Sequence, residues 1–129
     1  MAVLASVLSI LAGLVHIAIF LAETVWWRRP VVWRAFRLPN QAAADDTAFF
    51  AFNQGFYNLF LAVGALLGAL FLLIGYSVAG WSLYLFSCTS MVIAALVLRM
   101  GGGPAYSRAA LAQAAVPGLA LLTAVPALA

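Results

Sequence analysis

The sequence predicts an all-α integral membrane protein: a bundle of four transmembrane helices with one longer cytoplasmic loop at the membrane interface. First, 67% of its 129 residues are hydrophobic and 7% are charged, which is too apolar for a soluble domain of this length. Second, several apolar runs reach the roughly 20 residues that a membrane-spanning helix needs. Third, all six cationic residues are arginines, and they follow the first and third runs. The positive-inside rule explains this placement, so no nucleic-acid partner is expected. One transmembrane domain, residues 1–129, is predicted.

The first helix is predicted over about residues 3–25. Trp26 and Trp27 follow it and suit the membrane–water interface, and two arginines and a proline come next. This stretch lacks the basic start and the small-residue cleavage site of a signal peptide, so we expect it to be retained as a helix.

The second helix is predicted over about residues 47–74. Asp45, Asp46 and Thr47 offer oxygens for its N-cap and negative charge at the positive end of its dipole. The preceding segment, residues 28–46, interleaves aromatic and aliphatic residues with arginines. That pattern is typical of a short stretch lying in the lipid headgroup zone.

The third and fourth helices are predicted over about residues 80–98 and 106–128. The glycines at 101–103 and Pro104 separate them, and Pro117 is expected to kink the fourth. The turn at 75–79 carries no charge, so both arginine-bearing loops lie on one side of the membrane. The arginine rule makes that side cytoplasmic and both termini non-cytoplasmic.

The first helix contains the two strongest candidates for chemistry, His16 and Glu23. They are the only histidine of the chain and the only carboxylate inside a predicted span. Seven residues apart, they share one helix face and are separated by about 10 Å along the axis. An ionisable group inside a membrane indicates a functional site by default.

The second helix brings polar side chains to the same cytoplasmic half of the membrane. Gln54 and Asn58 are four residues apart and share a face, and Gln113 enters the fourth helix at a similar depth. We expect these amides to face the acid and the histidine of the first helix. Each amide could equally serve only as a hydrogen bond between helices, worth on the order of 1 kcal/mol. The polar set of the second helix is Asn53, Gln54, Tyr57 and Asn58.

Two further patterns bear on partners. One histidine, one nearby carboxylate and a lone cysteine make a poor metal shell, so no metal or other cofactor is expected. Gly64 and Gly68 form a G-x-x-x-G pattern within an apolar helix. This pattern indicates close helix contact, either inside the chain or in a homodimer.

Three stretches give the chain a family resemblance: "HIAIFLAETVW" at 16–26, "NQGFYNLFLAVG" at 53–64, and Gln113 followed by Pro117. Together they resemble the family called domain of unknown function 1304 (DUF1304), small four-helix bacterial membrane proteins. The resemblance implies four spans, a shared His/Glu/Asn/Gln set and a multi-pass place in the bacterial inner (cytoplasmic) membrane, but it implies no activity. The chain departs from the family pattern in having Arg37 where F-G-L has glycine, and in a Gln-to-Pro spacing one residue longer.

The polar set and its aromatic surroundings favour an enzyme. An acid desolvated by aromatic walls holds its proton, and aromatic faces stabilise cations. Such a site suits protonation of an alkene or epoxide in a lipophilic isoprenoid or polyene, leading to isomerisation or cyclisation. Glu23 would donate the proton and His16 would take one back. The residues expected to bind or orient the substrate are Asn53, Gln54, Tyr57, Asn58, Gln113, Trp26 and Phe56.

Two other classes of function stay open. The chain could be a small proton-coupled transporter, with Glu23 exchanging a proton for its substrate. It could also be a structural or accessory membrane subunit without chemistry of its own. Aromatic residues gathered at one level favour the enzyme, whereas a continuous polar path through both leaflets would favour the carrier. In each case the expected partners are membrane lipid and, for the first two classes, a small molecule.

Overall fold

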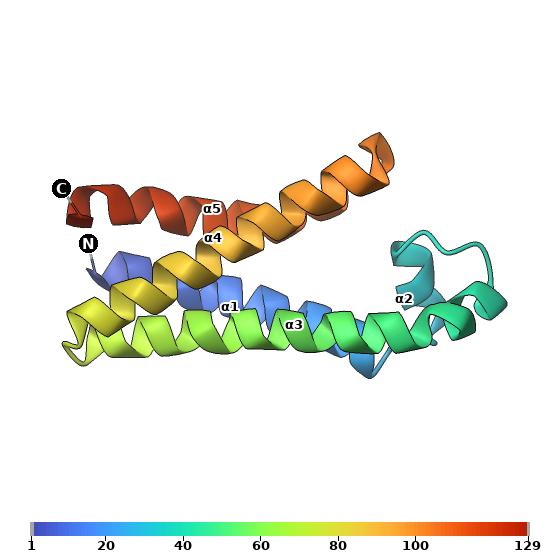
Figure 1. Cartoon of the computed structure of the whole chain (residues 1–129), viewed down its shortest axis with the longest axis horizontal. Helices are drawn as coiled ribbons and strands as arrows, with labels where there is room; N and C mark the ends of the chain where they lie inside the picture. Colours follow the sequence, from blue (N-terminus) through green and yellow to red (C-terminus); the bar gives the residue numbers. More distant parts are fainter. Residues whose placement is uncertain (1, 129) are drawn as a thin grey trace. The chain divides into compact units, whose positions relative to one another are not determined.

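The structure, a computed structural model, describes residues 2–128 and contains helices but no strands among them. Within this range, four helices are long and apolar enough to span a membrane, which agrees with the fold class predicted from the sequence (Figure 1). Residues 1 and 129, which belong to the predicted domain, lie outside the described range. The elements in chain order are α1 (Ala2–Thr24), α2 (Pro30–Ala35), α3 (Gln41–Leu73), α4 (Ser77–Gly102), the 3₁₀ helix η1 (Pro104–Tyr106) and α5 (Ser107–Leu128).

Helix α3 begins six residues before the predicted start at Thr47. The reason is Asn40, whose side-chain oxygen accepts a hydrogen bond from the backbone N–H of Ala43 at 2.9 Å. This is the geometry of an N-cap, so Asn40 caps the helix. Asp45, Asp46 and Thr47 lie in the second helical turn, and the N-cap role predicted for them is wrong.

The loop between α1 and α3 contains the short helix α2. Its last turn closes with two hydrogen bonds, Leu38 N–H to Trp33 O at 3.0 Å and Arg37 N–H to Arg34 O at 2.9 Å. This pair defines a Schellman cap, which needs a left-handed residue just after the helix. Arg37 takes that conformation with φ of 63°. The left-handed backbone explains why glycine suits this position in the F-G-L pattern.

Helix α4 starts three residues earlier and ends four residues later than predicted. Gly75, with φ of 90°, makes the tight turn before it, so the connection to α3 is shorter than the expected 75–79. Helix α5 continues through Pro117, which is buried. A proline in a membrane helix is tolerated where neighbouring groups satisfy the backbone that it leaves free.

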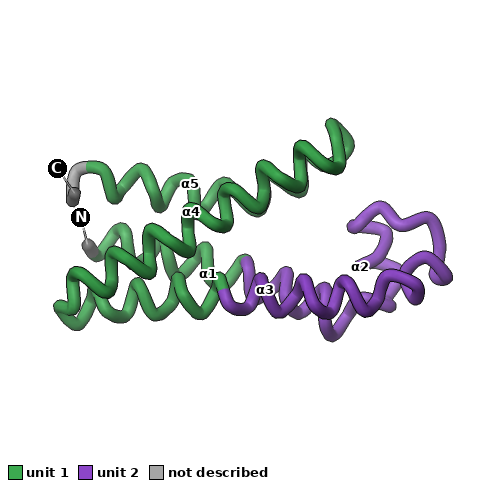
Figure 2. The backbone as a smooth tube through the Cα atoms, viewed as in Figure 1, with its two compact units in different colours: residues 1–15, 61–129 green, residues 16–60 purple. Residues whose placement is uncertain are grey.

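The chain divides into two compact units, which are described separately (Figure 2). Unit 1 comprises Met1–Val15 and Leu61–Ala129, and unit 2 comprises His16–Phe60. Four helices contribute to the core of unit 1, and most of its members are small. Small side chains let helices approach closely, which is how helices without a hydrophobic driving force between them associate in lipid. The largest core cluster is Ala5, Leu72, Tyr84, Cys88, Ala120 and Ala124.

The G-x-x-x-G pattern of α3 packs against α4 inside unit 1. A Cβ atom added to Gly68 would lie 2.7 Å from the backbone nitrogen of Tyr84, and one added to Gly64 would meet the hydroxyl of Ser87. Gly80 of α4 is equally close to the backbone of Leu72. Of the two alternatives left open by the sequence, the structure therefore shows packing within the chain. A homodimer through Gly64 and Gly68 stays a prediction.

Candidate functional site

The site is built in unit 2, where the last turns of α1 approach the first half of α3, and Gly55 sets the distance between the two helices. A Cβ atom at this position would lie 2.5 Å from Cγ2 of Thr24 and 3.2 Å from Cβ of Glu23. The Thr24 side chain is held in place because its hydroxyl donates to the carbonyl of Phe20 at 2.6 Å. Only glycine allows this approach without moving a neighbour.

Close approach brings Asn58, one turn after Gly55, against Glu23. The Asn58 amide donates a 2.8 Å hydrogen bond to Oε2 of Glu23. Both side chains are buried, at 4% and 7% exposure. A buried carboxyl needs a hydrogen-bonding partner, and among the described residues Asn58 fills that role. The contact predicted between an α3 amide and the α1 acid is confirmed for this pair.

Glu23 forms part of the wall of a partly enclosed hollow of about 270 Å³. This volume lies just below the range of about 300–1,000 Å³ that is usual for ligand sites. The hollow combines one buried acid, one cation and several apolar side chains, so it suits a guest that has both a polar and an apolar part. Its lining residues are Glu23, Thr24, Val25, Trp27, Arg28, Ala48 and Phe52.

Two contacts hold the side chain of Trp27, the tryptophan on this wall, in position. The indole N–H of Trp27 donates to the carbonyl of Ala44 at 2.8 Å, and its ring packs edge-on against Phe36 with centroids 4.9 Å apart. The indole is buried at 8% exposure. Phe36, directly after α2, and Ala44 of α3 therefore hold Trp27 in place on the wall of the hollow.

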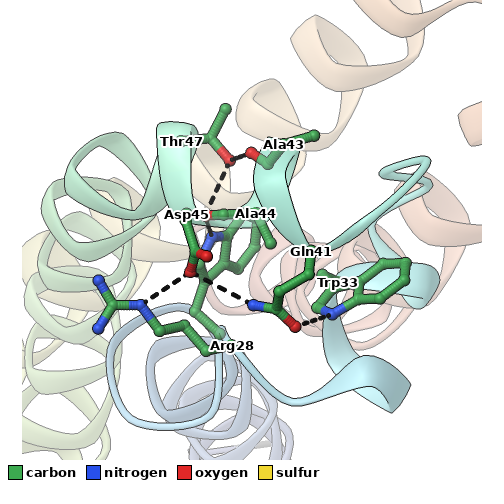
Figure 3. Close-up of polar contacts among 8 residues, drawn as sticks. Arg28, Trp33, Gln41, Ala43, Ala44, Asp45 and Thr47 are labelled. Atoms are coloured by element: carbon green, nitrogen blue, oxygen red, sulfur yellow. Dashed lines mark hydrogen bonds and ion pairs between the residues drawn. The ribbon is translucent and has the colours of Figure 1, made fainter.

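A chain of polar contacts holds the cation of the wall (Figure 3). Arg28 pairs through Nε with Oδ1 of Asp45 at 3.2 Å. The same oxygen accepts from the Gln41 amide at 3.3 Å, and Gln41 in turn accepts from the Trp33 indole at 3.1 Å. The acid paired with Arg28 is therefore Asp45, which lies on the exposed surface, rather than the buried Glu23.

The other residues predicted for the site are placed differently. His16 is completely buried in α1 and is not among the residues that line the hollow. Asn53, Gln54 and Tyr57 are exposed. Asn53 lies five residues before Asn58, about 140° around the helix, so it turns away from α1. Gln54 shares the side of Asn58, but it is its backbone carbonyl that receives the second Asn58 hydrogen bond, at 3.3 Å.

The two aromatic residues predicted for the site, and the glutamine predicted from the fourth helix, are not among the residues that line the hollow. Trp26 is 37% exposed and lies under the Arg29 guanidinium, 5.6 Å from its ring centroid. Phe56 is half-buried and packs edge-on against Phe20 at 5.4 Å. Gln113 belongs to unit 1, where it is half-buried in α5. Neither Trp26 nor Phe56 lines the hollow, whereas Trp27 and Phe52 do.

The sequence reasoning missed the roles of Gly55, Thr24 and Arg28. A signal for Gly55 was available, because a glycine inside an apolar helix and next to amides marks a close helix approach. Arg28 gave no such signal, since a basic residue after a span is already explained by membrane orientation. In the described part of the chain, no three His, Cys, Asp or Glu side chains come together as a metal-binding group.

These features define a class: an all-helical protein with four helices able to span a membrane and an acid–amide pair buried at the edge of a small hollow. Residues 10–125 match the model of the family described as "Protein of unknown function (DUF1304)". The chain belongs to that family, as its motifs suggested, and both Glu23 and Asn58 fall within the matched range. Searches of curated proteins and of solved structures found no match. The function must therefore be argued from the site.

Proposed function

We propose that the protein is a membrane enzyme that uses Glu23 as a proton donor to a lipophilic substrate. The observation that carries the proposal is a buried carboxyl on the wall of a hollow that accepts a hydrogen bond from a neutral amide. Among residues 2–128, the ion pair that the structure shows joins Arg28 to Asp45 and leaves this carboxyl out. Removal from water without a cationic partner favours the neutral acid, which can donate a proton. The rest of the wall supplies the apolar and aromatic surface that a lipophile needs.

The Glu23 carboxyl group alone can supply and take back the proton in the proposed reaction. The Glu23 O–H bond breaks as a C–H bond forms at one carbon of a substrate alkene, and the π electrons supply that bond. The neighbouring carbon becomes cationic, and the aromatic side chains of Trp27 and Phe52, which line the same hollow, stabilise it. The Glu23 carboxylate then takes a proton from an adjacent carbon, which moves the double bond and restores the acid. Because the same group gives and receives the proton, His16 need not reach the substrate.

Asn58 positions the acid in this scheme. Its amide donates to Oε2, so the other carboxyl oxygen can hold the proton. When the carboxylate forms, the same donor stabilises the new charge. A substrate such as an isoprenoid or polyene would reach the site from the acyl-chain region, and its reacting part alone would need to fit the 270 Å³ hollow.

Hydrogen exchange tests the proposal without knowledge of the product. The protein is placed in lipid nanodiscs in heavy water with squalene, farnesol or geranylgeraniol, and deuterium uptake into the recovered alkene is measured by mass spectrometry. We expect uptake with the wild type and none with Glu23→Gln. That variant should keep its stability, because the glutamine oxygen still accepts from Asn58.

Asp46→Asn is the matched control, since it neutralises an exposed acid of the same unit. It should leave the uptake unchanged. Uptake no higher than in empty nanodiscs across the three probes, or equal uptake in Glu23→Gln, would refute the proposal.

The proton-coupled carrier is the second candidate, and one observation favours it. His16 and Glu23 are both buried on one face of α1, at 0% and 7% exposure. Buried ionisable groups in a membrane helix commonly mark proton pathways. Proton flux into proteoliposomes under an imposed pH gradient, lost in both His16→Ala and Glu23→Gln, would support the carrier instead.

A further inference from the structure

The cation on the wall of the hollow indicates which class of lipophilic substrate the site accepts. This inference rests on the proposed function. We infer that the hollow takes an amphiphile whose apolar chain enters beside Glu23 and whose anionic end, a phosphate or a carboxylate, is held by Arg28. The two residues line the same hollow and differ sharply in environment. Glu23 is 7% exposed, whereas the Arg28 side chain is 72% exposed.

Arg28 has unused capacity to bind an anion. A guanidinium has five N–H donors, and the contact with Asp45 is made through Nε. Figure 3 shows the two terminal nitrogens of Arg28 pointing away from Asp45. Two parallel N–H groups on that edge match the spacing of two oxygens on a phosphate or carboxylate. The Asp45 contact therefore orients the guanidinium and leaves its anion-binding edge open.

Arg29 and Arg34 of the same loop lack this arrangement. Arg29 lies over Trp26, and Arg34 lies over Trp33 at 5.1 Å from the ring centroid. Neither lines the hollow. Arg28 is thus distinguished from them by position rather than by charge, which allows a matched control.

The sequence of polar and apolar groups along the wall also fits an amphiphile. Arg28 follows α1, and Glu23 lies inside its last turn, so the cation is nearer the predicted interface than the acid. Val25, Ala48 and Phe52 supply the apolar surface of the hollow. A guest with its charge at Arg28 would place the first part of its chain, rather than its charged end, beside the acid.

Binding of a matched pair of probes tests the inference. Radiolabelled farnesol and farnesyl phosphate share one chain and differ in the anionic end. In zwitterionic nanodiscs, we expect the wild type to bind the phosphate about tenfold or more tightly than the alcohol. Arg28→Gln should abolish this preference without weakening farnesol binding. Arg34→Gln, which removes the same charge from the same loop, should retain the preference.

Two further measurements distinguish the inferred site from a general binding site for anionic lipids. Asp45→Asn removes the negative charge beside the Arg28 guanidinium but keeps an oxygen that can accept from Nε. The preference for farnesyl phosphate over farnesol should therefore persist or increase. Added phosphatidylglycerol separates a dedicated amphiphile site from a general headgroup site. It should compete poorly with farnesyl phosphate if the hollow admits a single chain.

The inference would be overturned by a wild type that binds both probes equally, by an equal loss in Arg28→Gln and Arg34→Gln, or by full displacement with phosphatidylglycerol. These outcomes are independent of the chemistry, because Glu23→Gln should keep the binding preference even though it loses deuterium uptake. If uptake depends on Glu23 but no phosphate preference exists, the proposed function stands and this inference fails. If the phosphate preference exists without deuterium uptake, this inference stands and the proposed function fails.

Discussion

Replacement of Gly55 by alanine should separate the two helices that form the site. The new Cβ atom would lie 2.5 Å from Cγ2 of Thr24, and ordinary contact begins at 3.4 Å, so the atoms must move apart by 3.4 − 2.5 = 0.9 Å. If α3 retreats by that amount, the 2.8 Å bond from Asn58 to Glu23 lengthens to 3.7 Å, beyond hydrogen-bonding distance. We therefore expect loss of both packing and the acid–amide pair.

The size of the effect follows from these two terms. Overpacking a well-fitted contact costs about 1–3 kcal/mol. The hydrogen bond between membrane helices adds on the order of 1 kcal/mol. Gly55→Ala should therefore lower the free energy of unfolding by about 2–4 kcal/mol, as measured by equilibrium unfolding in mixed micelles.

Thr24→Ser supplies a specific rescue, because it removes the clashing methyl and keeps the hydroxyl that bonds to Phe20. In a double-mutant cycle with Gly55→Ala, it should recover about 1 kcal/mol or more. Gly118→Ala is the control, since a Cβ atom there meets nothing within 4 Å, and it should not destabilise the protein. The reasoning is refuted if Gly55→Ala is as stable as the wild type, or if Thr24→Ser gives no coupling.

Three other predictions concern the cap, the glycine contact and the topology. Arg37→Gly should be more stable than Arg37→Ala by about 1 kcal/mol, because both remove the side chain and only glycine relieves the left-handed backbone. Equal stability of the two variants would contradict the Schellman cap of α2. Gly68→Ala should cost about 1–3 kcal/mol with no change in oligomer size, because the added Cβ atom meets the Tyr84 backbone. A changed oligomer size without lost stability would support the homodimer instead. Reporter fusions should place both termini outside the cytoplasm, and a cytoplasmic signal from either end would overturn the arginine-based orientation.

The sequence by itself determined the fold class, and it singled out Glu23 as the carboxyl of the candidate site. Four apolar runs of sufficient length leave the backbone little choice in lipid except helices, because each polar backbone group must be satisfied within its own segment. Glu23 was identifiable because a carboxylate inside such a run is rare. The N-Q-G-x-Y-N stretch also pointed to the partner helix, since buried amides need partners.

Tertiary structure decided which amide reaches the acid and where the helix begins. Asn53, Gln54 and Asn58 are equally polar in sequence, and the crossing of α3 over α1 at Gly55 selects Asn58. The start of α3 depended on whether Asn40 or the later acids turned an oxygen toward the first free N–H groups, a choice of local geometry that composition does not encode.

Arg28 shows the same limit most clearly. In the sequence it is one of four arginines after a span, all equally explained by orientation. Only the folding of α2 and α3 back toward the end of α1 gives Arg28 a place on the hollow, and leaves Arg29 and Arg34 over tryptophan rings. Hydrophobic length and charge bias are properties of segments, so the sequence reveals them. The hollow depends on distances between residues that are far apart in the chain, so it exists only in the folded protein.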